Sequence, residues 1–166
     1  MKLYIKQEVF RALPRFKVLD EQGNEKYDIG TQGMIQVGLK LHIHDMNGTE
    51  LAVLKQKFFS LTPTFHIFKN DVQTASIVKK ITLMKPKYVI EELGWTVEGD
   101  FLAHEYTISD STGVIMTISK EWFSWGDSFV IDMNRSNNEI EAIAVVLAID
   151  CVMDAKEEQV VDNLMN

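Results

Sequence analysis

The sequence predicts a mainly β fold: a closed antiparallel barrel of about twelve strands around one buried hydrophobic helix near the C-terminus. Two observations predict it. Residues 140–153 read IEAIAVVLAIDCVM, with no polar residue between Ala142 and Ile149, so no face of this helix is suited to water. Before residue 136, short runs of alternating apolar and polar residues are separated by clusters of turn residues, which is typical of hairpins in a sandwich or barrel.

The helix predicted at about residues 138–155 is too short to span a membrane. A spanning helix needs about 20 apolar residues, whereas Asp150 interrupts this run. The protein itself must therefore surround the helix. Asn138 followed by Glu141 approximates a capping box at the helix start. The polar residues after Asp154 are expected to continue the helix or to fray outside the core.

The strands predicted over about residues 1–135 are joined by turns that recur along the chain. Turn sequences rich in Asp and Asn lie near residues 22, 47, 71 and 111. Asn47–Gly48 is the strongest hairpin signal, because a type I′ turn needs positive φ at both central residues. No low-complexity segment or proline-rich linker interrupts the chain, so residues 1–166 are predicted to form a single barrel domain.

Composition is that of an ordinary globular protein, since 46% of the 166 residues are hydrophobic and 25% are charged. The N-terminal sequence MKLYIKQEVF alternates and shows no secretory-signal pattern, which leads us to expect a cytoplasmic location. Cys151 is the sole cysteine, so no internal disulfide can form, in keeping with a reducing compartment. Its place in the apolar helix indicates a small core residue and not a nucleophile.

Charge is distributed unevenly along the chain, whose formal net charge is −7. Residues 40–90 contain eight lysines and three acidic residues, whereas residues 91–132 contain nine acidic residues and one lysine. These segments are interpreted either as two faces of opposite sign or as solvated strand faces. The acidic total argues against nucleic acid as a partner, because such binding requires clustered basic side chains.

Three segments carry a resemblance to a known family. They are Gly38–Phe68 (GLKLHIHDMNGTELAVLKQKFFSLTPTFHIF), Lys120–Asp132 (KEWFSWGDSFVID) and Glu141–Asp154 (EAIAVVLAIDCVMD). In sequence and order they resemble the LURP-one-related proteins of the Tubby C-terminal-like superfamily, in particular its small bacterial members. The resemblance covers essentially the whole chain and implies a twelve-stranded barrel around a central C-terminal helix.

The resemblance says less about activity than about fold. Larger members of the superfamily include the Tubby proteins, which bind phosphoinositides, and the phospholipid scramblases, which act at membranes. No Tubby phosphoinositide-binding residue can be placed on this chain by motif. The chain also shows neither a palmitoylated cysteine run nor an acidic calcium loop. Function must therefore be argued from candidate sites.

His42 and His44 lie two residues apart on a predicted strand, so both side chains point to one face of the sheet. With a third ligand from Asp45, His66 or His104, they would form a site for zinc or another divalent ion. The alternative is a pair of exposed strand residues beside a turn. No HExxH or CxxC spacing supports a metal, and the sequence predicts no metal site, cofactor site or catalytic residue.

Lysines around the sequence ITLMKP are the candidates for contact with an anionic partner: Lys79, Lys80, Lys85 and Lys87. Each lysine close to an anionic membrane contributes about 1 kcal/mol to binding. Solvated strand ends are the alternative interpretation.

Aromatic residues cluster around a predicted turn at Gly126–Asp127. The cluster comprises Trp122, Phe123, Trp125 and Phe129. It is interpreted either as core packing or as an exposed patch for a partner or membrane.

These observations predict a non-enzymatic cytoplasmic binding or scaffold protein that contacts membrane phospholipids or a protein partner through its outer surface. A small-molecule carrier is the first alternative, although a plug of Ile, Val and Leu fills the space that a ligand in a barrel needs. An enzyme without a linear motif is the second. The sequence does not predict the oligomeric state.

Overall fold

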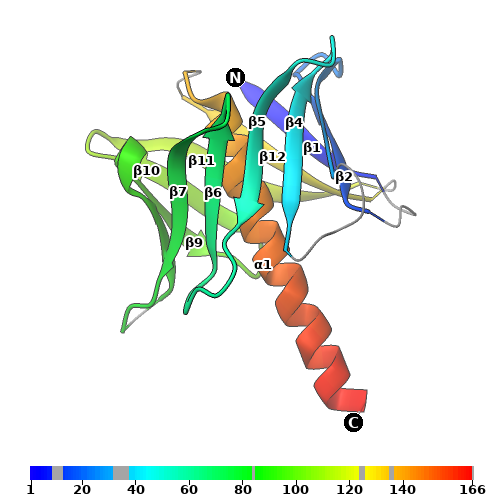
Figure 1. Ribbon diagram of the computed structural model, residues 1–166. Helices are drawn as coiled ribbons and strands as arrows, with labels where there is room; N and C mark the ends of the chain where they lie inside the picture. The colour runs from blue at the N-terminus through cyan, green and yellow to red at the C-terminus, as the bar shows by residue number, and fades with distance from the viewer. Residues whose placement is uncertain (9–12, 32–37, 84, 124–125, 135–136, 166) are drawn as a thin grey trace.

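The computed structural model is a closed antiparallel barrel of twelve strands with one long helix through it, as the sequence predicts (Figure 1). The structure describes residues 1–8, 13–31, 38–83, 85–123, 126–134 and 137–165. The barrel closes where β1 pairs with β12, with Leu3 opposite Ile131. The elements are β1 (Lys2–Gln7), β2 (Arg15–Leu19), β3 (Glu25–Gly30), β4 (Lys40–Asp45), β5 (Glu50–Gln56), β6 (Thr64–Lys69), β7 (Val72–Lys80), β8 (Lys87–Ile90), the 3₁₀ turn η1 (Glu91–Leu93), β9 (Trp95–Asp100), β10 (Glu105–Asp110), β11 (Gly113–Phe123), β12 (Gly126–Met133) and α1 (Glu139–Met165).

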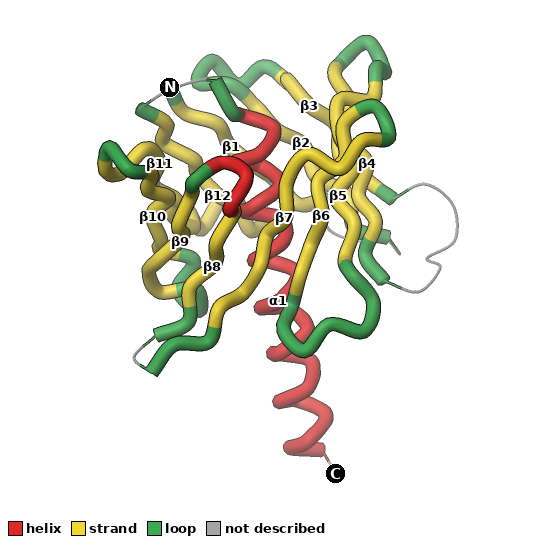
Figure 2. Tube along the Cα trace, turned by 60° about the vertical axis from the view of Figure 1, so that its left-hand side comes forward, coloured by secondary structure: helices red, strands yellow, loops and turns green. Residues whose placement is uncertain are grey.

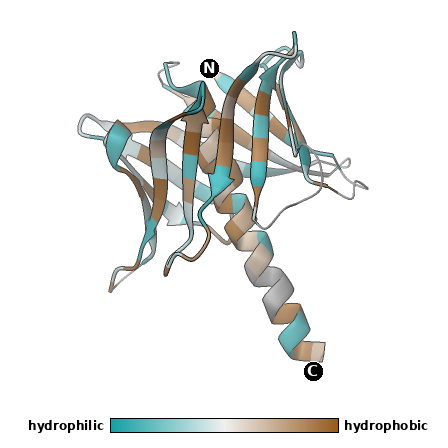
Figure 3. Ribbon diagram, in the orientation of Figure 1, coloured by the Kyte–Doolittle hydropathy of each residue, from teal (hydrophilic) through white to brown (hydrophobic). Residues whose placement is uncertain are grey.

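The strands place their apolar residues on the inner face of the barrel. In β1, Leu3 and Ile5 are fully buried while Lys2 and Lys6 are exposed, which is the period of two expected for a sheet with one wet face. Figure 3 shows the same alternation of hydropathy along neighbouring strands. The inward residues and the helix form one hydrophobic core.

Helix α1 fills the axis of the barrel, where the ring of strands surrounds it (Figure 2). No residue from Ala142 to Ile149 is more than 1% exposed, so the prediction of a helix buried on all sides is confirmed. The helix does not end near residue 155, because it continues to Met165. We call residues 154–165, which leave the barrel, the stalk. Within the described ranges, no helix is both long and apolar enough to cross a membrane.

The hairpin turns repeat one local geometry. Oδ1 of Asp45 accepts hydrogen bonds from the backbone N–H groups of Asn47 (2.9 Å) and Thr49 (2.8 Å). Asp20 does the same for Gln22 (2.9 Å) and Asn24 (2.8 Å). The hairpin predicted at Asn47–Gly48 is confirmed.

Its turn type, however, is not I′. Gly48 has φ +82°, whereas Asn47 is not among the residues with positive φ. The aspartate side chain bonds the backbone two residues on and so holds Asn47 in an Asx turn. A bulge in the register between Ile43 and His44 absorbs the extra residue.

The two ends of the barrel differ. Tight turns form the end at which α1 begins, and we call it the turn end. Longer connections form the other end, from which the stalk leaves (Figure 1). This exit end includes loop residues 57–63 after β5, 81–86 after β7 and 101–104 after β9.

Candidate functional site

The lysines predicted to contact an anionic partner lie near the exit end but face different ways. Lys79 follows the buried Ala75 and Ile77 at alternate positions of β7, so it belongs to the inner face of the barrel, at its mouth. Lys80 belongs to the outer face, where its Nζ lies 3.8 Å from Oε1 of Glu91. Lys79 and Lys80, which are adjacent in sequence, thus lie on opposite faces of the barrel wall.

Lys85 lies at the edge of the wall and lines a space on each of its two faces. It lines an outer groove of about 630 Å³ together with Lys87, and an inner cavity of about 280 Å³ together with Lys79. Nζ of Lys87 lies 4.0 Å from Oε1 of Glu98 on the outer wall. The four lysines therefore do not form the single patch that their proximity in sequence suggests.

Large exposed apolar side chains surround the lysines at the exit end. Phe59, Leu61 and Leu83 are essentially fully exposed. The loops of this end also expose Phe58, Ile81 and Leu102. Phe59 has φ +53°, a conformation that is rare for a bulky residue and often marks a functional segment.

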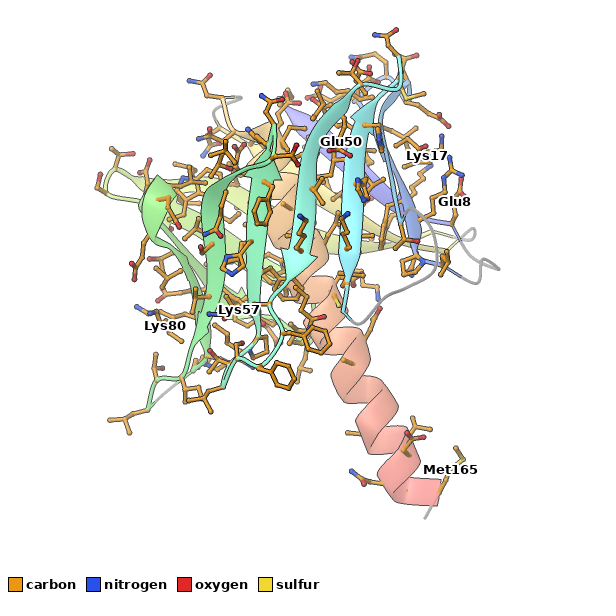
Figure 4. All side chains as sticks on the ribbon, in the orientation of Figure 1. Glu8, Lys17, Glu50, Lys57, Lys80 and Met165 are labelled. Atoms are coloured by element: carbon orange, nitrogen blue, oxygen red, sulfur yellow. The ribbon has the colours of Figure 1, made fainter. Side chains whose placement is uncertain are left out.

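Charge separates the two ends. Among the described residues of loops 57–63, 81–86 and 101–104, the charged side chains are Lys57 and Lys85. Figure 4 shows Lys57 and Lys80 on the side of the exit end away from Met165, the tip of the stalk. The turns of the opposite end are acidic, with Asp20, Glu21, Asp71, Glu91 and Glu92. These three connections of the exit end are therefore apolar and basic, whereas the turns at the opposite end are acidic.

The inner cavity lies between α1 and the wall formed by β7, β8 and β9. Its lining includes Tyr88, Phe101, Leu102 and Met153 in addition to the two lysines. Tyr88 is fully buried, and burial raises the pKa of its hydroxyl to about 12. Tyr106 lies nearby, with Phe101 packed between the two tyrosine rings, and burial raises its pKa as well. Both hydroxyls are therefore protonated at neutral pH.

A cavity also lies on the other side of α1 at the exit end, with a volume of about 240 Å³. Phe16, Leu41, Asp150 and Cys151 contribute to its lining. Cys151 is partly exposed there, and so stands at the edge of the core. A cavity therefore lies beside α1 at this end, although Ala142–Ile149 are packed on all sides within the barrel.

The comparisons with known proteins agree with this architecture. The family model for LURP-one-related proteins matches residues 1–150. This chain belongs to the LURP-one-related family. It is 29% identical over 159 residues to "Uncharacterized protein YxjI" of Bacillus subtilis (strain 168), covering 96% of this chain and 98% of the relative.

A solved structure gives the same picture of the fold. The LURP-one-related barrel described here is similar to the X-ray structure of an Arabidopsis thaliana protein, with a TM-score of 0.60 and 13% identity over 90% of this chain and 91% of that one. At this identity the likeness shows the fold alone. The resemblance found in the sequence is thus confirmed for family and architecture, and the function still has to be argued from the site.

The histidines of this LURP-one-related barrel do not gather around a metal position. Nδ1 of the buried His42 lies 2.6 Å from Oε2 of Glu50, and His44 stacks on His42. The proposed third ligands are engaged elsewhere: Asp45 in its turn, and His66 with Ser76 at 3.2 Å. His104 packs against Phe129. In the described ranges, no three His, Cys, Asp or Glu side chains are placed to hold a metal ion.

The aromatic cluster is described only in part. Phe129 is 1% exposed, so this member belongs to the core. Gly126 and Asp127 pair with Phe123 and Trp122 and belong to strand β12, so the turn predicted at Gly126–Asp127 is wrong. Residues 124–125 fall outside the described ranges, as do the side chains of residues 122–127.

Sequence reasoning missed the apolar tips of the exit end and the inner cavity. Leu83 and Phe59 stand in unremarkable short apolar runs, and Tyr88 reads as a core residue of a strand. A signal was present in the order of the loops, because acidic tight turns alternate along the chain with longer apolar connections, and the connections at 57–63 and 81–86 contain Lys57 and Lys85. In an up-and-down barrel, alternate connections share an end.

Proposed function

We propose that this protein is a non-enzymatic binding protein that docks reversibly on anionic phospholipid membranes through its exit end. The observation that carries the proposal is the coincidence of exposed apolar tips with lysines on the same loops. Leu83 and Lys85 share one loop, and Phe59, Leu61 and Lys57 share the next. This combination suits the boundary between headgroups and acyl chains, where apolar side chains insert and lysines stay among phosphates.

The exposed apolar side chains should contribute more to the free energy of membrane binding than the lysines do. Burial of a Leu or Phe side chain contributes about 1.5–3 kcal/mol, so Phe59, Leu61 and Leu83 together outweigh a few lysines at about 1 kcal/mol each. Part of this favourable free energy is offset by the translational, rotational and side-chain freedom that the protein loses on binding. The expected result is weak, reversible association that anionic lipid and low salt strengthen.

The stalk limits the orientation of docking. Asp154 and Asp162 are exposed on it, and an anionic surface repels carboxylates. The docking surface is therefore the side of the exit end formed by residues 57–63, 81–83, 85–86 and 101–104, away from the stalk tip (Figure 4). The acidic turn end then faces away from the membrane.

The test is co-sedimentation with vesicles of phosphatidylcholine alone or with about 30% phosphatidylserine, at low and physiological salt. Leu83→Glu places a carboxylate on an exposed tip and should weaken binding to the anionic vesicles at least tenfold. Met46→Glu is the matched control, because Met46 is an exposed apolar residue of the turn end. It should leave binding unchanged.

Two results would contradict the proposal. One is absence of binding to anionic vesicles at low salt, which would favour a protein as the occupant of these loops. The other is equal binding by Leu83→Glu and Met46→Glu.

Replacing Lys79, Lys80, Lys85 and Lys87 together by alanine should lower the salt-sensitive part of the binding.

A further inference from the structure

The last two turns of the stalk expose apolar side chains to solvent. Val160, Val161, Leu164 and Met165 are 58%, 50%, 81% and 76% exposed. Residues four apart are neighbours on the surface of a helix, so these four side chains form one stripe, which we call the tip stripe. A contiguous apolar surface on a projecting element marks a site of interaction.

The loops of the same copy do not cover the tip stripe. The stalk spans residues 154–165 and is about 18 Å long, and its tip projects beyond the exit-end loops in both views (Figures 1 and 2). Phe59, Leu61 and Leu83 on those loops are themselves essentially fully exposed. One copy therefore leaves two apolar surfaces uncovered at the same end, and a second copy is needed to bring them together.

The two surfaces carry opposite charge. Residues 154–165 contain four acidic residues and one lysine. The charged side chains among the described residues of loops 57–63 and 81–86 are Lys57 and Lys85. Opposite charges orient two surfaces toward each other, whereas like charges at an interface disfavour association. An acidic stalk is therefore better matched to the basic loops than to another acidic stalk.

We propose that the stalk of one copy docks on exit-end loops 57–63 and 81–86 of a second copy, and that the two copies form a dimer with two-fold symmetry. Stalk and loops lie at the same end of the barrel, so two exit ends that face each other make this contact twice. The first stalk meets the second copy's loops, and the second stalk meets the loops of the first. Such an interface closes on itself and does not extend into a filament.

The size of the surface also favours the loops as the partner of the stalk. Two stalks that met only each other would bury the four side chains of each tip stripe. The stalk and residues 57–63, 81–83 and 85–86 together supply about 24 residues per copy, and a stable interface uses about 20–30 residues on each side. We expect a Kd on the order of 10–100 µM, so the chain is monomeric at the low concentrations of a denaturation experiment.

The dimer does not rest on membrane docking, but its consequence for docking does. Phe59, Leu61 and Leu83 are the side chains proposed to enter the membrane, and the partner's stalk would cover them. Dimer and membrane-bound monomer therefore compete for one surface. Anionic vesicles should dissociate the dimer, and a high protein concentration should lower the fraction of each chain that binds to vesicles.

The first experiment is sedimentation equilibrium of the full chain without lipid, at concentrations from about 1 µM to about 1 mM. The average mass should rise from the 19.0 kDa of the monomer toward twice that value. Salt at about 0.5 M should raise the Kd several-fold, because it screens the attraction between stalk and loops. A chain that stays monomeric up to about 1 mM would overturn the proposal.

Substitutions on the stalk test the tip stripe. Leu164→Asp places a carboxylate on the stripe and should raise the Kd of the dimer at least tenfold. Asn163→Asp is the matched control, because it adds the same charge at an exposed neighbour that lies off the stripe. It should change the Kd less than threefold. Equal effects of the two substitutions would contradict docking through the stripe.

Substitutions on the loops identify what the stripe contacts. Leu83→Glu should also raise the Kd of the dimer at least tenfold, and Met46→Glu at the turn end should leave it unchanged. If Leu164→Asp weakens the dimer and Leu83→Glu does not, the stalks contact each other and the proposed contact with the loops is wrong.

Vesicle binding separates the dimer from the docking proposal. Leu164→Asp should bind anionic vesicles at least as well as the unmodified chain, whereas Leu83→Glu should lose both vesicle binding and dimerisation. A dimer that forms without lipid in a chain that binds no vesicles would leave the interface standing and remove the docking function. Vesicle binding by a chain that never dimerises would do the reverse.

Discussion

Lys69 at the end of β6 forms an ion pair with Glu141 in the first turn of α1. Beside it, Glu139 accepts hydrogen bonds from Lys26 Nζ (2.6 Å) and from the Tyr27 hydroxyl (2.8 Å). Burial raises the pKa of Tyr27, so its hydroxyl keeps the proton that it donates. Carboxylates also favour a helix N-terminus. Two strands on different parts of the ring thus hold the start of the helix, and these contacts fix how far α1 is inserted into the barrel.

Glu141→Gln should lower the free energy of unfolding by about 1–3 kcal/mol, because Glu141 is buried and the Lys69 ammonium would lose its counter-charge. Urea denaturation followed by tryptophan fluorescence measures this. Glu25→Gln is the control, since Glu25 pairs with Lys17 at 2.9 Å on the exposed outer wall and should cost less than about 1 kcal/mol. Equal losses in the two variants would show that the helix is positioned by packing alone.

The helix offers a matched pair of valine substitutions. Val146 is fully buried in the barrel, whereas Val160 is 58% exposed on the stalk. Val146→Asp places a carboxylate among apolar side chains at a cost of several kcal/mol and should prevent folding. Val160→Asp should change the unfolding free energy by no more than about 0.5 kcal/mol. Soluble protein with a native circular dichroism spectrum after Val146→Asp would mean that this part of α1 is not the core of the barrel.

The contrast between these valines also shows what the sequence can and cannot predict. Burial of Ala142–Ile149 follows from local composition, since a helix without a polar face must be surrounded. The hairpins at residues 20–24 and 45–49 follow from local turn chemistry. The site does not follow, because it depends on which loops meet when the barrel closes. Lys79 and Lys80 are neighbours in the sequence, yet the strand period sends them to opposite faces of the wall.

Alanine substitutions at two glycines allow the cost of backbone strain to be distinguished from the cost of a steric clash. Gly99 and Gly113 both have positive φ, at +150° and +118°, but a Cβ on Gly99 would meet backbone atoms at 2.5 Å, and a Cβ on Gly113 would meet nothing within 4 Å. Gly113→Ala should therefore cost about 1 kcal/mol through strain. Gly99→Ala should cost about 2–4 kcal/mol, because β9 must move away from β10. Thermal unfolding measures both, and equal costs would contradict the close contact of Gly99 with Tyr106.

The acid limb of the stability curve should depend on Asp28. Arg15 donates hydrogen bonds to both oxygens of this carboxylate, at 3.1 Å and 2.6 Å, and these bonds hold the pKa of Asp28 below its ordinary value of 3.8. The folded state therefore binds this proton less readily than the unfolded state does. The stabilisation is fully present above the unfolded-state pKa and is lost as the pH falls through the folded-state pKa.

Asp28→Asn should lower stability at pH 7 by less than about 1 kcal/mol, since Asp28 and Arg15 are partly exposed. It should also make the decline of stability below about pH 4 shallower than in the unmodified protein. Urea midpoints measured from pH 7 to pH 3 test both effects. Asp71→Asn removes a carboxylate from an exposed turn and controls for net charge. If Asp28→Asn and the unmodified protein lose stability in parallel over this range, the Arg15 contact does not carry the acid sensitivity.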